Sequence, residues 1–282
     1  MSSAAVDWVR RWEGIYDGRV RASRKDYSVD HWTARAEDYS EYRRTDQYGY
    51  GSSVYDALAA HGVVGPSSRV LEVGSGPGTF VIPFAKRVAH MTAVEPAEGM
   101  IRMMQRDAAE AGITNYDIIQ KIWQDVDTPA IRGSYDLVIT STVIWMFRDI
   151  LQQISRMEEA ARGYCCVVES AGSAHGFEKN LWHSIMDDKP YPAYPGYPLI
   201  YNILYQNGRI PQVRMIQART VRSFDMLMNV YRIFYSLYTE ITPEVEKKIR
   251  SALHVESRSG LHERSYHAAV VWWDPKEPRE SI

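Results

Sequence analysis

The segment from Val70 to Gly78 constrains the fold of this chain more than any other stretch of its 282 residues. Apolar residues and one carboxylate, Glu72, precede glycines at alternate positions, Gly74, Gly76 and Gly78. An apolar run that ends in a glycine turn predicts a strand followed by a helix. Glycine in that turn lets the backbone approach a ligand closely, because no Cβ is in the way. The segment therefore indicates a nucleoside-binding α/β unit.

A second carboxylate, Glu95, closes the next apolar run and is placed to accept hydrogen bonds from a ribose diol. Two cofactors fit this pattern, a dinucleotide and S-adenosylmethionine. Several details favour S-adenosylmethionine. Thr79 stands where a dinucleotide fingerprint has its third glycine, and the sheet continues into a late pair of strands. Glu72 would repel a pyrophosphate, but it would attract the sulfonium and ammonium groups of S-adenosylmethionine.

Strand and helix alternate through the middle of the chain at the spacing of βαβ units, so the core of the sheet is expected to be parallel. The expected strands are at 69–73, 91–95, 117–122, 135–140 and 163–169. The expected helices are at 28–61, 78–88, 97–111 and 149–161. Gly112 follows the third of these helices, and glycine is common just beyond a helix C-terminus.

The alternation breaks after residue 170. Residues 186–198 are rich in proline and tyrosine, and we expect an ordered aromatic loop there. A strand at 211–218, a helix with one apolar face from Phe224 to Tyr238, and a strand at 266–273 are expected to follow. Between that helix and the last strand, Thr242 and Pro243 are typical of the start of another short helix.

These motifs resemble those of the class I S-adenosylmethionine-dependent methyltransferases. Val70–Gly78 matches that family's first motif, Ala93–Met100 its second-strand motif and Tyr135–Ser141 its fourth-strand motif. The likeness covers residues 28–170 well and 210–273 more loosely. It implies an α/β fold: a Rossmann-like, mostly parallel sheet of seven strands, with helices on both faces and a helical, aromatic lid.

The same resemblance implies a division of the chain into three parts. An N-terminal helical cover would occupy residues 1–65, and an S-adenosylmethionine-binding core would occupy residues 66–170. Residues 171–282 would supply the lid insertions over the substrate and the last two strands of the sheet.

The resemblance also implies the residues that bind the cofactor, which are Tyr39, Glu72, Gly74, Ser75, Gly76, Gly78, Glu95, Pro96, Met100, Trp123, Gln124, Asp125 and Ser141. Those in the glycine turn would surround the methionine part of S-adenosylmethionine, and Glu95 would hold the ribose hydroxyls. Pro96 and Met100 would contact the adenine from one side. Ordinary packing or turn formation remains the alternative explanation for Trp123, Asp125 and Tyr39.

Methyl transfer from a sulfonium is an in-line displacement that leaves S-adenosylhomocysteine, and the enzyme mainly aligns the reactants and excludes water. A general base is needed only if the acceptor must lose a proton. Glu169, His175 and His183 follow the fifth strand and are the candidates. The alternative for each histidine is a structural role. No set of metal ligands stands out in the sequence, so no metal is expected.

The leading interpretation is a methyltransferase for a small molecule, because the aromatic segments 190–201 and 224–240 are suited to roofing a closed pocket. A protein methyltransferase and a non-catalytic S-adenosylmethionine-binding module are the alternatives. Nucleic-acid amino-methyltransferases have Asn/Asp-Pro-Pro-Tyr/Phe after the fourth strand, where residues 140–143 here are Thr-Ser-Thr-Val. Cytosine-5 enzymes need a Pro-Cys pair, and neither cysteine follows a proline.

Composition sets the remaining bounds. The formal net charge is -2 and no run of Lys or Arg indicates a nucleic-acid partner. No apolar stretch approaches the roughly 20 residues that span a bilayer, so we expect no membrane partner. Cys165 and Cys166 are neighbours in an apolar run and would point to opposite faces of a strand, so a mutual disulfide is not expected. We expect a cytoplasmic protein, and its oligomeric state is left open.

Overall fold

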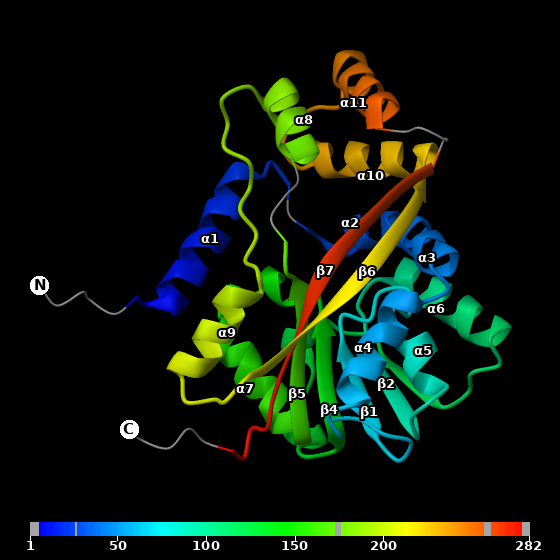
Figure 1. Ribbon diagram of the computed structural model, residues 1–282, viewed down its shortest axis with the longest axis vertical. Coiled ribbons are helices and arrows are strands. Elements are labelled where there is room, and N and C mark those ends of the chain that lie inside the picture. The colour runs from blue at the N-terminus through cyan, green and yellow to red at the C-terminus, as the bar shows by residue number, and fades with distance from the viewer. Residues whose placement is uncertain (1–5, 26, 173–175, 257–260, 278–282) are drawn as a thin grey trace, which may run out of the picture.

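A seven-stranded sheet forms the centre of the protein, in the order β3-β2-β1-β4-β5-β7-β6. The computed structural model (Figure 1) describes residues 6–25, 27–172, 176–256 and 261–277. The strands are β1 Arg69–Val73, β2 His90–Val94, β3 Tyr116–Ile119, β4 Tyr135–Ser141, β5 Ala161–Ser170, β6 Gln212–Ser223 and β7 Leu261–Trp273. The five strands expected in the middle of the chain are therefore confirmed to within a few residues, and both late strands are longer than predicted.

The first five strands pair in parallel, as the βαβ spacing predicts. The strand β7 is antiparallel to both of its neighbours, β5 and β6. The seven-stranded, mostly parallel Rossmann-like sheet expected from the resemblance is thus confirmed. Because parallel strands end at the same edge, the turns after β1, β2 and β4 meet there, and that edge positions the site.

Helices cover both faces of the sheet. On one face lie α4 Gly49–Ala59, α5 Val81–Ala85 and α6 Glu98–Glu110. On the other lie α1 Trp8–Ala22, α7 Ile150–Ala160 and α9 Tyr197–Gln206. Cys166 packs with the first group of helices and Cys165 with the second, and both are free thiols. Adjacent strand residues point to opposite faces, so the two cysteines are kept apart.

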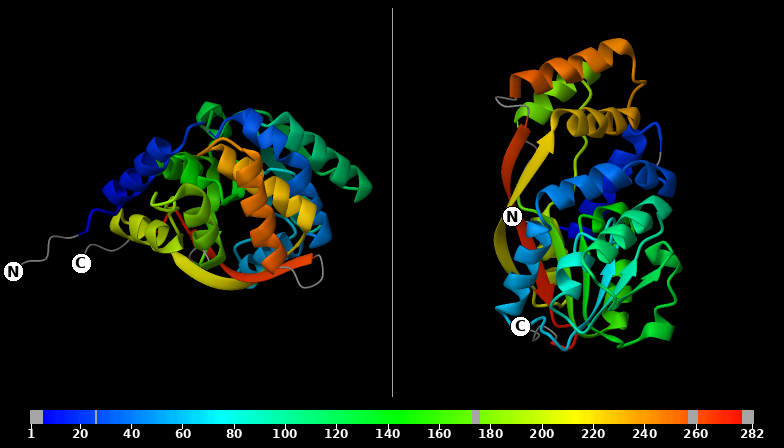
Figure 2. Two further views of the ribbon diagram at one scale, coloured as in Figure 1. Left: turned by 90° about the horizontal axis from the view of Figure 1, so that it is seen from above. Right: turned by 90° about the vertical axis from the view of Figure 1, so that its right-hand side faces the viewer.

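A separate helical lid stands beyond the edge of the sheet where the strands end. Its helices are α8 Gly176–Met186, α10 Phe224–Ser236 and α11 Pro243–Glu256, which share an apolar cluster with Trp182 and Tyr235 at its centre. Figures 1 and 2 show the lid carried on a long twisted ribbon of β6 and β7. Residues 268–273 of β7 pair with β5, whereas residues 217–223 of β6 pair only with 261–267 of β7.

The prediction of one long helix at 28–61 is wrong. The chain forms three helices there: α2 Val29–Ala34, α3 Ala36–Thr45 and α4. Gln47 and Tyr48 have positive φ angles, 50° and 57°, which end the α-helical path between α3 and α4. In Figure 2, α2 and α3 lie between the sheet and the lid.

Other boundaries also differ from the sequence prediction. The helix expected at 78–88 is reduced to α5, because Gly78 has a φ of +91° and cannot belong to a right-handed helix. The predicted aromatic loop ends early, since α9 begins at Tyr197 with Pro198 in its first turn, where proline is tolerated. The helices α1 and α8 have no counterpart among the expected elements. The Thr242 cap is confirmed, because its hydroxyl accepts a hydrogen bond from the Val245 amide at 3.3 Å.

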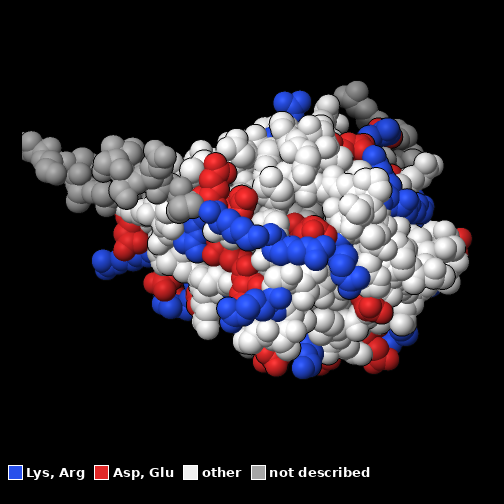
Figure 3. Space-filling model, turned by 90° about the horizontal axis from the view of Figure 1, so that it is seen from below, with Lys and Arg blue, Asp and Glu red and all other residues white. Residues whose placement is uncertain are grey.

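The surface opposite the lid carries charges of both signs, interspersed rather than segregated (Figure 3). Ion pairs such as Arg162 with Asp136 at 2.7 Å, and Arg209 with Glu158 at 2.7 Å, join neighbouring elements of the lower half of the molecule. Such a mixed surface presents no extended field of one sign to a polyanion. Among the described residues, no helix is long and apolar enough to cross a membrane.

Candidate active site

A cavity of about 310 Å³ lies where the carboxyl ends of β1, β2 and β4 meet the cover helices α2 and α3. It brings together most of the residues expected to bind the cofactor, namely Tyr39, Glu72, Gly74, Ser75, Gly76, Glu95, Pro96, Met100, Trp123, Gln124 and Ser141. Gly78 and Asp125 are not among the lining residues. Gly78 instead lets the chain turn into α5. The side chain of Asp125 is exposed on a short 3-10 helix, Trp123–Asp125.

The glycine turn after β1 forms the floor of this cavity. Gly74 has a φ of +70°, and a Cβ on it would lie 2.5 Å from the Val143 Cγ2 atom. Gly76 also has a positive φ, +54°, in open space. The Gly74 amide donates a hydrogen bond of 2.8 Å to the Val94 carbonyl of β2. The first two glycines are therefore required by backbone shape and close packing, and they leave amide groups near the cavity.

Glu95 joins the glycine turn to the end of β2. One carboxylate oxygen accepts a hydrogen bond of 2.8 Å from the Gly76 amide, and the other accepts one of 2.9 Å from the Ala97 amide. Burial raises the pKa of Glu95, and these two amides oppose that rise. Each carboxylate oxygen has a second lone pair, so this fixed carboxylate can still accept hydrogen bonds from a ligand diol.

Glu72 is the most buried acid of the floor, with 1% of its surface exposed. Its Oε2 atom has no hydrogen-bond partner among the residues that the structure describes. Burial and the neighbouring Glu95 raise the pKa of Glu72 well above its usual value, while the Val81 amide and the Arg43 guanidinium oppose the rise. An uncompensated buried carboxylate is costly, so this position favours a cationic ligand group.

Arg43 of α3 faces the same cavity from the cover. It is 7% exposed, and its Nε and one terminal nitrogen, Nη1, have no hydrogen-bond partner. Its guanidinium stacks 4.3 Å from the ring centre of Tyr42 and 4.9 Å from that of Tyr50. Unpartnered N–H groups on a buried cation are suited to a carboxylate. The cavity thus presents an acid on its floor and a cation on its cover.

Flat apolar surfaces form the remaining walls. Trp123 is 3% exposed, and the guanidinium carbon of Arg156 lies 5.3 Å from its ring centre. Met100 and Pro96 lie at the end of β2 and the start of α6, and also line the cavity. On the cover, Trp32 and Tyr39 meet edge to face with their ring centres 6.2 Å apart. Such walls suit an adenine ring.

The loop after β4 also lines the cavity, through residues from Ser141 to Phe147. Thr142 has a φ of +52°, an unusual conformation for a threonine, and its amide and carbonyl are bonded to Val168 and to the Trp145 indole. Strained residues of this kind cluster at ligand sites. The α1 helix holds this loop from outside, because the Trp12 indole donates a hydrogen bond of 2.7 Å to the Phe147 carbonyl.

The three candidate bases lie in different surroundings. Glu169 is 5% exposed at the end of β5, its Oε1 atom has no hydrogen-bond partner, and burial raises its pKa to about 8. It does not line the cavity, although it acts electrostatically on Tyr50, whose hydroxyl lies 2.9 Å from that of Ser141. His183 is exposed on α8 with Nδ1 3.3 Å from the Asp187 carbonyl oxygen. His175 lies outside the described residues.

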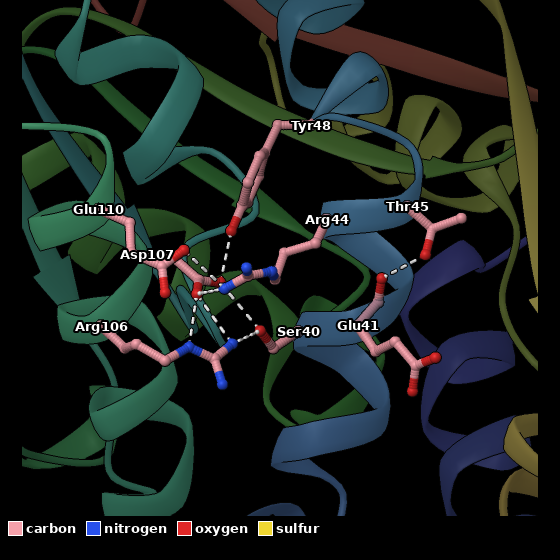
Figure 4. A network of polar contacts seen from close by, with 8 residues as sticks. All are labelled: Ser40, Glu41, Arg44, Thr45, Tyr48, Arg106, Asp107 and Glu110. Carbon is pink, nitrogen blue, oxygen red and sulfur yellow. Dashed lines mark hydrogen bonds and ion pairs between the residues drawn. The ribbon is translucent and has the colours of Figure 1, made fainter.

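The cover is fastened to the core through one buried acid, Asp107 of α6 (Figure 4). Its carboxylate accepts hydrogen bonds from the hydroxyls of Ser40 at 2.8 Å and Tyr48 at 2.6 Å. It also pairs with Arg44 at 2.9 Å and Arg106 at 2.8 Å. Three of these four partners belong to α3 or the turn after it, so this network fixes the cover helix that carries Tyr39 and Arg43.

Sequence reasoning missed several residues that line the cavity from the cover, from the loop after β4 and, for Lys121, from the segment after β3. They are Tyr27, Trp32, Lys121, Val143, Met146 and Phe147. The segment after the fourth-strand motif was the available signal for the last three, because the carboxyl ends of neighbouring strands share an edge. Tyr27 and Trp32 carried no signal beyond the abundance of aromatic residues near the N-terminus.

Comparison with known proteins supports the same fold. Residues 70–162 match the family model for a methyltransferase domain. An uncharacterized protein of Haemophilus influenzae is 21% identical over 151 residues, which are 54% of this chain and 54% of that protein. The chain therefore spans about half the length of this curated relative.

Two solved structures share the architecture. YcgJ from Bacillus subtilis aligns with a TM-score of 0.52 and 15% identity, over 78% of this chain and 97% of that one. Magnesium protoporphyrin IX methyltransferase from Synechocystis PCC 6803, solved with bound S-adenosylhomocysteine, aligns with a TM-score of 0.50 and 18% identity, over 83% and 85% of the two chains. Identities this low show the fold alone.

The sheet order, the glycine turn and the acid at the end of β2 together define a class I methyltransferase fold. Residues 70–162, which carry the glycine turn and that acid, match a methyltransferase domain.

Proposed function

We propose that this protein binds S-adenosylmethionine and transfers its methyl group to a small-molecule acceptor. The proposal rests on two buried ionisable side chains that line the same cavity, Glu72 on the floor and Arg43 on the cover. Each has side-chain atoms without a hydrogen-bond partner among the described residues. S-adenosylmethionine carries both cationic groups and a carboxylate at its methionine end. A neutral or purely anionic ligand would leave Glu72 without a partner.

The residues of the cavity fit the cofactor part by part. Glu95 holds the two ribose hydroxyls, with its carboxylate kept in place by the Gly76 and Ala97 amides. Trp123 and Met100 enclose the adenine, and Arg43 binds the methionine carboxylate. Tyr39 and Trp32 close over the ligand from α2 and α3. Gly78 and Asp125 act indirectly, by shaping the turns on either side.

The sulfonium supplies an already activated methyl group, so the protein contributes alignment and a dry site. The loop after β4 performs the alignment, because Ser141, Thr142 and Val143 lie between the glycine turn and the acceptor side. The aromatic residues of the cover exclude water. Contacts with α1 and hydrogen bonds within the loop fix its position, so the loop keeps the methyl donor and the acceptor aligned during the reaction.

Glu169 is the residue that we propose as general base for an acceptor that loses a proton. A pKa of about 8 leaves it partly ionised near neutral pH, which suits proton transfer. The Tyr50 and Ser141 hydroxyls, 2.9 Å apart, connect its surroundings to the cavity wall. His183 lies on the outer side of the lid and has no such connection among the described residues. The closed cover favours a small acceptor over a protein chain.

Calorimetric titration with S-adenosylhomocysteine tests the cofactor assignment. Glu95→Ala is expected to weaken binding by about 1–3 kcal/mol, the loss typical of charge-assisted hydrogen bonds. Glu98→Ala is the matched control, because Glu98 is exposed on the neighbouring helix and, in the part of the chain that the structure describes, pairs only with Arg102 at 2.9 Å. Equal affinities for the two variants would refute the ribose role of Glu95.

Methyl-labelled S-adenosylmethionine and a metabolite extract test the transfer. Label in the acid-soluble small-molecule fraction is expected. Label in acid-precipitable material would mean a protein acceptor, and tight cofactor binding without any labelled product would mean a binding module.

A further inference from the structure

A second cavity adjoins the first behind the loop after β4. Its volume is about 150 Å³, and its lining residues are Tyr16, Arg19, Val20, Ser23, Lys25, Tyr27, Trp145 and Met146. Tyr27 and Met146 line both cavities, so they form the boundary between them. A ligand in the main cavity that extends past these two side chains reaches the end of α1.

Arg19 of α1 is the buried charged residue of this second cavity, whereas Lys25, which also lines it, is exposed. It is 4% exposed. One of its terminal nitrogens, Nη2, donates a hydrogen bond of 2.6 Å to the Trp145 carbonyl, and the other, Nη1, has no hydrogen-bond partner within the described part of the chain. Among the described residues no carboxylate pairs with it. A buried cation without a counter-ion is unfavourable, so the position is arranged for an anion that comes from elsewhere.

Aromatic rings surround the same guanidinium. Its central carbon lies 4.5 Å from the ring centre of Trp145, 5.3 Å from that of Tyr16 and 5.4 Å from that of Tyr194. Contacts with ring faces offset part of the cost of burial but leave the Nη1 hydrogens unsatisfied. Burial lowers the pKa of Arg19, and the nearby tyrosines oppose this change. An arginine still carries its charge at physiological pH, so the demand for a negative partner remains.

A cluster of tyrosine hydroxyls ties this boundary to the lid. The Tyr27 hydroxyl lies 2.8 Å from that of Tyr194 and 3.2 Å from that of Tyr238, and the last two are 3.4 Å apart. The Tyr27 ring also meets Trp145 edge to face at 5.1 Å. Tyr194 comes from the aromatic loop and Tyr238 from the residues after α10. Three distant segments therefore converge where the two cavities meet.

We propose that the methyl acceptor is a small organic acid, whose anionic group binds Arg19 in the second cavity while its nucleophilic atom lies in the main one. This inference rests on the proposed function. Arg19 is the one buried cation among the described residues that line this cavity, and Lys25 is exposed to solvent, so the buried part of the site matches one negative charge and favours a carboxylate over a doubly charged phosphate. The acid group is the anchor and the methyl group goes to another atom of the acceptor, so the product keeps its charge.

Benzoate is the first probe, because it joins a carboxylate to a flat ring that suits the aromatic wall. Titration into the protein, with and without S-adenosylhomocysteine, is expected to show binding of benzoate and none of benzamide. Arg19→Met is expected to weaken benzoate binding at least tenfold. Its unfolding midpoint should not fall below that of the wild type in the absence of benzoate, because an unpaired buried charge has been removed.

Two control variants distinguish an effect of Arg19 on benzoate binding from an effect on the structure of the loop after β4. Arg148→Met breaks the surface pairs of the same loop with Asp17 and Glu13, at 2.9 and 3.3 Å, and should leave benzoate binding intact. Arg21→Met removes an exposed charge from the same helix and should also leave it intact. Equal binding by Arg19→Met and the wild type would overturn the proposal, and so would an equal loss in Arg148→Met. If inorganic phosphate displaces benzoate at a concentration below that of benzoate, the second cavity binds a free inorganic anion rather than the acid group of an acceptor.

The labelled product gives an independent test. After transfer from methyl-labelled S-adenosylmethionine in a metabolite extract, the labelled small molecule should be retained by an anion exchanger at neutral pH. A neutral or cationic labelled product would overturn the acidic acceptor while leaving the proposed function in place. Absence of any labelled product would count against the proposed function, and the benzoate titration would then decide on the anion site alone.

Discussion

The floor and the cover of the site carry buried charges of opposite sign. The floor holds Glu72 and Glu95, at the carboxyl ends of β1 and β2, and burial raises the pKa of each. The cover holds Arg43 and, beside the second cavity, Arg19, each with N–H groups that lack a partner. In most proteins such charges would pair with one another. Their separation across a cavity means that a ligand carrying both signs completes the pairing.

The two regions also differ in how they are built. The floor comes from turns at one edge of a parallel sheet, and its groups are fixed largely by backbone hydrogen bonds. The cover is assembled from segments far apart in the chain, and side chains such as Asp107 and the tyrosine cluster hold it in place. Substitutions in the floor are therefore expected to destabilise the protein through backbone strain. Substitutions in the cover are expected to destabilise it through loss of side-chain contacts.

The largest effect is expected in the floor, at Gly74. Gly74→Ala places a Cβ 2.5 Å from Val143 at a φ of +70° and should destabilise the protein by about 2–5 kcal/mol, from left-handed strain and overpacking together. Gly62→Ala has the same φ of +70° with nothing within 4 Å, and should cost only about 1–2 kcal/mol. Urea unfolding measures both, and equal losses would mean that the close packing of the floor is unimportant.

The second effect concerns Glu169, the buried acid at the end of β5, and depends on pH. The pKa of Glu169 is raised to about 8 in the folded protein, so the folded state keeps this proton between pH 5 and 8 while the unfolded chain has lost it. Folding stability therefore falls as the pH rises through that range. Glu169→Gln should gain about 2–3 kcal/mol relative to the wild type between pH 6 and pH 9. A pH-independent difference in urea unfolding would place Glu169 in a solvated environment.

The third effect is on affinity and tests the cation of the cover. Arg43→Met should weaken binding of S-adenosylhomocysteine by about 2 kcal/mol, because a charged hydrogen-bond partner of the carboxylate is lost. Methylthioadenosine has the nucleoside but no carboxylate, so its affinity should be unchanged. Calorimetry measures the affinity for both ligands. An equal loss of affinity for both would mean that Arg43 holds the cover in place and does not bind the carboxylate.

The smallest effect is expected from loosening the cover. Asp107→Asn keeps the shape of the side chain but removes the charge shared with Arg44 and Arg106, and should cost about 1–2 kcal/mol in urea unfolding. Although burial works against it, the partners of Asp107 keep its pKa below the usual value. Its contribution is therefore present above about pH 4 and is lost in stronger acid. An unchanged variant at pH 7 would mean that α3 is held by apolar packing alone.

The sequence predicts the floor well and the cover poorly, for a physical reason. The glycine turn and Glu95 were predictable because backbone shape and the shared edge of parallel strands limit which residues can stand there. Arg19, Tyr27 and Tyr194 are far apart in the chain, and only the packing of the lid on the sheet brings them together. The break at Gln47 and Tyr48 was also hidden, because neither residue type usually marks a left-handed turn.

The lengths of β6 and β7 determine how far the lid helices stand from the edge of the sheet. Each residue adds about 3.4 Å to an antiparallel strand, and adding residues in twos preserves which face each side chain occupies. Two extra residues in each strand beyond the sheet would raise the lid helices by about 7 Å without changing the turns that hold the nucleoside. Under the proposed function, a longer ribbon would leave room for a larger acceptor, with the floor of the cavity unchanged.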